Sequence, residues 1–84
     1  MSDDGDQRLA DMVAELARGL VDSPGAVRVE RERDGETTVL SLYVAQEDLG
    51  QVIGRGGRIA RSLRLIAKQA AHTRGGRVNL EIVD

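Results

Sequence analysis

The apolar residues of this 84-residue chain recur at helical spacing in three segments. Residues 7–21 and 58–73 each repeat apolar positions at i, i+3, i+4 and i+7, which predicts two amphipathic helices. Their buried stripes consist of Leu9, Met12, Val13, Leu16, Ala17 and Leu20 in the first, and of Ile59, Leu63, Ile66, Ala67 and Ala70 in the second. Residues 46–53 fit a shorter helix whose last two residues point inward. Residues 1–6 are polar and acidic, and we expect them to form a flexible lead.

Three other segments alternate apolar and polar residues with the period of two that is typical of β-strands. They comprise residues 26–34, 36–44 and 77–83. The Asp34-Gly35 pair is typical of a tight hairpin, so the first two strands should pair antiparallel. The long connection from the second strand to the third contains two helices, which is enough for a parallel crossover. The order of elements therefore predicts a single α+β domain with a mixed three-stranded sheet.

A turn with three glycines, Gly54-Arg55-Gly56-Gly57, separates the short helix from the last helix. Without Cβ atoms, its backbone N–H groups can approach a phosphate closely. The N-terminus of the following helix, at Arg58, directs free N–H groups and its positive dipole end to the same place. A Walker loop is excluded because no Lys-Ser or Lys-Thr pair occurs in the chain. A dinucleotide fingerprint is excluded because its third glycine would fall at Ile59 and because a helix precedes the turn.

The remaining pattern, Ile53-Gly54-x-x-Gly57 between two helices, resembles the signature of the KH domain. The GXXG loop of that domain clamps the backbone of about four nucleotides. The resemblance extends over the whole chain to the small bacterial single-KH proteins of the KhpA family. It implies a type II KH fold over residues 7–84, in which three helices cover one face of the sheet. It also implies the role of an RNA chaperone or post-transcriptional regulator.

The charges of the chain are segregated, although the net charge is only −2. Residues 1–48 hold 12 acids and 5 bases, whereas residues 49–80 hold seven bases and no acid. An acid-free segment around a glycine turn is typical of a polyanion-binding surface. The last predicted helix carries a cationic face opposite its apolar stripe, at Arg61, Arg64, Lys68 and His72. The alternative is that this face is an ordinary solvated surface.

The predicted RNA-binding residues fall into two groups. The backbone of RNA would contact Gly54, Arg55, Gly56, Gly57, Arg58 and Arg61. By the KH resemblance, the bases would lie in an apolar groove along the short helix, the turn, the long helix and the neighbouring strand. Val52, Ile53 and Ile59 are candidates for its floor, and an ordinary core position is the alternative for each. Tyr43 is the only aromatic residue, so base stacking is not expected to be the main mode of binding.

Two functions remain open at this point. The first is the binding of single-stranded RNA, with single-stranded DNA as an alternative ligand. The second is a protein-interaction module, which apolar residues on nominally outer faces favour, at Val39, Tyr43, Leu65 and Val83. The family resemblance implies a homodimer or a heteromer with a second KH-containing RNA-binding protein. The two functions are compatible, because a dimer would supply the avidity that one weak site lacks.

The sequence offers little for catalysis. His72 is the one candidate general base, and it lies among cationic residues with no nucleophile or carboxylate beside it. The absence of cysteine excludes disulfides and thiolate metal sites, and a single histidine makes a zinc cluster unexpected. We therefore expect no enzyme activity, no metal and no cofactor. No signal peptide and no membrane span are expected, which favours the cytoplasm.

Overall fold

A computed structural model describes residues 3–84, apart from the side chains of Asp3 and Arg55. The elements in chain order are α1 (Asp3–Arg18), β1 (Arg28–Asp34), β2 (Thr37–Tyr43), α2 (Gln46–Ile53), α3 (Arg58–Thr73) and β3 (Arg77–Ile82). Short 3₁₀ turns lie at Pro24–Ala26 and Arg55–Gly57. No helix in the described part of the chain is long and apolar enough to cross a membrane.

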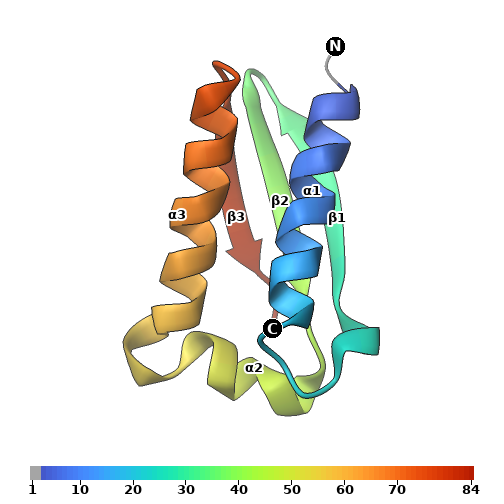
Figure 1. The fold of residues 1–84 in the computed structure, drawn as a ribbon, viewed down its shortest axis with the longest axis vertical. Coiled ribbons are helices and arrows are strands. Elements are labelled where there is room, and N and C mark those ends of the chain that lie inside the picture. Colours follow the sequence, from blue (N-terminus) through green and yellow to red (C-terminus); the bar gives the residue numbers. More distant parts are fainter. Residues whose placement is uncertain (1–2) are drawn as a thin grey trace.

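The three strands form one mixed sheet in the order β1-β2-β3. β1 pairs with β2 antiparallel through the Asp34-Gly35 hairpin, and β2 pairs with β3 in parallel. α1 and α3 lie side by side over one face of the sheet, and α2 crosses below them at one end of the molecule (Figure 1). The predicted α+β fold is confirmed, including the mixed sheet and the helices on one face.

The core lies between β2 and the two long helices. The largest fully buried apolar side chains include Leu40 and Leu42 on the central strand and Leu63 on α3. Both long helices meet this core largely through alanines, which are Ala10, Ala14 and Ala17 on α1 and Ala60, Ala67 and Ala71 on α3. Small side chains let a helix approach the sheet closely, so the chain fills a small core without aromatic residues.

The contact face of α3 is rotated from the one that the sequence predicts, although its bounds match. Ile66 belongs to the predicted buried stripe but is 40% exposed, and Ile59 and Ala70 are only partly buried. At the end of α2, the predicted inward position is confirmed for Val52, which is 1% exposed, and wrong for Ile53, which is 45% exposed. In α3, close packing through alanines leaves room for few large side chains, and the isoleucines lie on the flank of the contact.

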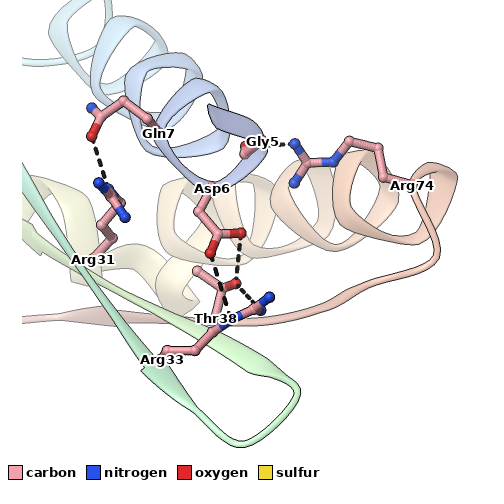
Figure 2. A network of polar contacts seen from close by, with 7 residues as sticks. All are labelled: Gly5, Asp6, Gln7, Arg31, Arg33, Thr38 and Arg74. Carbon is pink, nitrogen blue, oxygen red and sulfur yellow. Dashed lines mark hydrogen bonds and ion pairs between the residues drawn. The ribbon is translucent and has the colours of Figure 1, made fainter. Parts of the chain in front are cut away.

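α1 begins at Asp3 rather than at residue 7 and ends at Arg18 rather than at residue 21. A polar network ties its first turn to the hairpin and to the end of α3 (Figure 2). The Asp6 carboxylate accepts a hydrogen bond of 2.9 Å from the buried Thr38 hydroxyl and lies 3.8 Å from Arg33. Arg74 donates to the Gly5 carbonyl. These contacts explain why a polar, acidic segment is helical from Asp3 onward.

The loop after α1 leaves the helix at Gly19, so Leu20 is exposed rather than part of the buried stripe. This loop is held by Asp48 of α2, whose side chain is only 1% exposed. The two carboxylate oxygens of Asp48 accept hydrogen bonds from the backbone N–H groups of Asp22, at 3.2 Å, and Ser23, at 3.0 Å. A buried carboxylate with two backbone donors fixes the position of α2 relative to α1.

The substitution Asp48→Ala should lower the free energy of unfolding by roughly 1.5–3 kcal/mol, because it leaves two backbone N–H groups without their acceptor. The exposed neighbour Glu47 is the matched control, and Glu47→Ala should change the same quantity by less than about 0.5 kcal/mol. Urea unfolding followed by circular dichroism measures both. Equal effects of the two substitutions would contradict the anchoring role of Asp48.

Candidate nucleic-acid interface

The glycine turn begins where the backbone of α2 folds tightly against itself. The N–H group of Gly54 donates a 2.7 Å hydrogen bond to the carbonyl of Gly50 and ends α2. A Cβ atom at Gly54 would collide with that same carbonyl oxygen. Because the obstacle is backbone rather than a movable side chain, only glycine fits at this position.

The next glycines reverse the chain into α3. Gly56 and Gly57 both have positive φ angles, +74° and +70°, a region that residues with a Cβ rarely adopt. Gly57 precedes the first residue of α3 and offers no side chain to cap it, and the first turn of α3 contains no acid. The N–H groups that start the helix therefore have no side-chain acceptor, and they are available to an anion together with the positive end of the helix dipole.

Two of the three predicted arginines can be placed at this turn. The guanidinium of Arg61 donates a 2.9 Å hydrogen bond to the Gly56 carbonyl, which holds its positive charge against the turn. Arg58 is exposed at the first position of α3. The side chain of Arg55 lies outside what the structure describes, so its predicted contact with RNA stays a prediction.

The three predicted floor residues do not share one environment. Val52 is only 1% exposed and packs as an ordinary interior residue, which was the alternative for each of the three. Ile59 is half-buried and lines a hollow of about 510 Å³ between α2 and α3. Gly54 and Arg58 line the same hollow. The exposed Ile53 provides apolar surface at the end of α2. The role of these residues in base binding stays a prediction.

The cationic face of α3 lies beside the free edge of the sheet. Arg61, Arg64, Lys68 and His72 are all exposed, as the helical spacing predicts. The strand order makes β3 an edge strand, in agreement with the predicted hairpin and parallel crossover. Arg64 donates a 3.2 Å hydrogen bond to the Leu80 carbonyl of β3, so this side of α3 faces the edge strand. This contact brings the basic side chains of α3 beside the free backbone edge of β3.

Tyr43 lies on the other face of the sheet and is already engaged. Its ring is 4.1 Å from the guanidinium carbon of Arg28, and its hydroxyl donates a 3.2 Å hydrogen bond to Glu30. The buried neighbour Leu42 shows that successive β2 residues alternate between the two faces. The only aromatic side chain of the protein therefore lies on the sheet face that the helices do not cover.

The sequence matches a family model and two relatives along most of its length. The model of the family described as "KhpA/KhpB, KH domain" matches residues 10–82. "RNA-binding protein KhpA" from Treponema pallidum is 46% identical over 74 residues, which are 88% of this chain and 92% of the relative. "RNA-binding protein KhpA" from Aquifex aeolicus is 43% identical over 76 residues, which are 90% and 96% of the two chains.

One solved structure shares the fold. The chain matches part of the crystal structure of a single-residue variant of Era from Aquifex aeolicus bound to GDP.AlF4-, with a TM-score of 0.62 and 23% sequence identity. The match covers 88% of this chain and 29% of the Era chain. At this level of identity the likeness shows a common fold.

Alanine substitutions at two glycines of this region, Gly54 and Gly50, test the close contact at the start of the turn. Gly54→Ala should lower the free energy of unfolding by about 1–3 kcal/mol, because the new methyl group meets backbone that cannot move aside. Gly50→Ala should raise it by about 0.4–1 kcal/mol, because Gly50 lies inside α2 with open space around it. Denaturant unfolding measures both, and equal stability of the two variants would contradict the close contact at Gly54.

Proposed function

The chain belongs to the KhpA/KhpB family of KH domains, and we propose that it binds single-stranded RNA without catalysing a reaction on it. The observation that carries this proposal is the glycine turn, which exposes backbone N–H groups at the start of a helix and lies in a segment without acids. The names of the KhpA relatives, which describe them as RNA-binding proteins, support the same ligand. The protein would act as an RNA chaperone or post-transcriptional regulator in the cytoplasm.

Phosphates of the RNA would lie against the turn. The N–H groups at the start of α3 have no side-chain cap and would face the phosphate, and Arg61 is already held beside the turn by the Gly56 carbonyl. The N–H groups of Gly54 and Gly57 donate within the protein. Arg58 adds a second charge, and Arg55 a third by its position in the sequence. Backbone donors and guanidinium groups are both good ligands for phosphate oxygens, and neither distinguishes one base from another.

Bases would be recognised by the edge of β3. The N–H group of Val83 donates to the Leu42 carbonyl of β2, so the backbone groups of alternate residues, among them Ile82 and Leu80, point away from β2. The contact of Arg64 with the Leu80 carbonyl agrees with this direction. A free strand edge offers N–H donors and C=O acceptors to the base edges of a single strand, which a duplex would hide.

The affinity of one such domain for a short RNA should be weak and dependent on salt. Three to four neutralised phosphates correspond to a slope of about −2 to −3 in log K against log salt for a single strand. A homodimer, or a heteromer with a second KH-containing RNA-binding protein, would raise the affinity by linking two sites. Because phosphates carry much of the contact, single-stranded DNA is expected to compete.

A second candidate function is that of a protein-interaction module. Leu65 and Ile66, which are adjacent on α3, are 59% and 40% exposed and offer apolar surface to a partner. Val39 and Val83 are only partly exposed, so they favour this function less than the sequence indicates. In this case the KH scaffold would serve mainly to assemble the protein with itself or with another KH protein.

Fluorescence anisotropy with a randomised single-stranded RNA tests the proposed function. The double substitution Arg55→Asp/Gly56→Asp places two carboxylates in the turn and should abolish detectable binding. Arg8→Asp/Gly25→Asp is the matched control, because it makes the same change of charge at an exposed helix position and at a glycine with open space around it. The control should retain most of the affinity, and circular dichroism should show that both variants are folded.

Equal binding by the wild type and the turn variant would contradict a role of the turn and leave a diffuse cationic surface as the ligand site. If the wild type fails to bind any single-stranded RNA, the proposed function is wrong. The interaction module would then be the better account of the exposed residues on α3.

A further inference from the structure

A second hollow lies at the opposite end of α3 from the glycine turn. It has a volume of about 600 Å³ and is lined by the end of α3 and the start of β3. Its polar lining residues are Thr37, Lys68, Gln69, His72, Arg77 and Asn79. We call this hollow the end pocket. None of the predicted RNA-binding residues belongs to it.

The polar side chains of the end pocket are not engaged by the part of the protein that the structure describes. Among the described residues, the six polar side chains make no hydrogen bond or ion pair with the protein, and no acid lines the hollow. Two of them, Lys68 and Arg77, are cationic. Two others, Gln69 and Asn79, carry amide groups that can both donate and accept hydrogen bonds. The combination fits a ligand with an anionic group and a polar edge.

A neighbouring arginine cluster shows the opposite arrangement. The hollow of about 200 Å³ beside α1 is also lined by Arg33, Arg74 and Arg77. There, Arg33 lies 3.8 Å from the Asp6 carboxylate and Arg74 donates to the Gly5 carbonyl (Figure 2). The protein itself satisfies these two guanidinium groups, whereas Arg77, which also lines the end pocket, has no such partner among the described residues.

The end pocket continues the cationic face of α3. Lys68 and His72 lie seven and eleven residues after Arg61 and so share its side of the helix. This is also the side of Arg64, which faces β3. Lys68 is eleven residues and His72 fifteen residues beyond Gly57, so they lie about 16 Å and 22 Å along the helix axis from the turn. A GXXG loop clamps about four nucleotides, so a longer strand that follows α3 reaches this distance.

From these observations we propose that the end pocket binds one further nucleotide of the RNA strand that the glycine turn holds. Its phosphate would lie between Lys68 and Arg77, and Gln69 and Asn79 would hydrogen-bond the base or ribose. This inference rests on the proposed function. The pocket is open and polar, so a free nucleotide would bind weakly there, and attachment to a strand held at the turn supplies the missing affinity.

The test compares two single-stranded RNAs, one of about four nucleotides and one of roughly eight. Lys68→Gln/Arg77→Gln removes the charges of the end pocket but keeps polar side chains. Arg8→Gln/Arg18→Gln removes two charges from exposed positions of α1 and is the matched control. Anisotropy titrations at several salt concentrations give the affinity and the salt slope of each protein with each RNA.

The pocket variant should bind the short RNA as the wild type does and lose about tenfold in affinity for the long RNA. Its salt slope with the long RNA should be smaller by about 1.4, which corresponds to two lost charge contacts with a single strand. The control should match the wild type on both RNAs.

Other results would overturn the inference. A pocket variant that keeps its affinity for the long RNA, or that loses equally on both lengths or no more than the control, shows that the end pocket holds no further nucleotide. If the wild type binds neither RNA, the proposed function fails, and this inference fails with it.

Discussion

The candidate interface depends on one close backbone contact, between Gly54 and the carbonyl of Gly50. This contact ends α2 and fixes the direction from which the chain enters the glycine turn. Two glycines with positive φ then start α3 at once. Any Cβ at Gly54 would collide with this carbonyl and change the direction in which the chain enters the glycine turn. The geometry proposed to hold a phosphate therefore depends on how α2 ends, and the same glycine would serve both stability and binding.

α3 connects the core to the candidate interface, because one of its sides packs against the sheet and the other carries the cationic residues. One side packs against the sheet through Leu63 and a row of alanines, so the helix axis lies close to β3. That proximity brings the cationic side beside the free strand edge, where Arg64 reaches the Leu80 carbonyl. Larger residues in place of the alanines would separate helix and strand and widen the space between them. The cationic surface at the strand edge therefore depends on the small side chains in the core.

Much of the fold follows from local sequence signals. The bounds of α2 and α3 agree with the prediction because the glycine turn and the glycines after α3 interrupt the periodic pattern. The hairpin and the parallel crossover follow from a turn dipeptide and a connection length. The start of α1 could not be predicted, because it is held by Asp6 and Thr38, which are 32 residues apart in the sequence. The buried face of α3 differs from the prediction because periodicity weights large residues, whereas close packing selects small ones.

In the candidate site, too, some residues can be predicted from the sequence and others cannot. The glycine turn and Arg58 and Arg61 are close together in the sequence, so a motif identifies them. The end pocket combines residues of β2, α3 and β3, and only the strand order brings them together. Val52 and Ile53 are adjacent in sequence, but Val52 is buried and Ile53 is exposed. They differ because the end of α2 lies at the boundary between the interior and the surface. Spacing along one helix cannot decide which of two neighbours will be covered by the rest of the chain.

An amide chemical-shift titration by NMR locates the backbone groups that RNA contacts. With a single-stranded RNA of about four nucleotides, the largest shift changes should occur at the amides of residues 54–60 and at the free edge of β3. The amides of α1 and of β1 should change little. If the largest changes fall on the uncovered face of the sheet around Tyr43, or if the amides of the turn do not respond, the glycine turn is not the site that holds RNA.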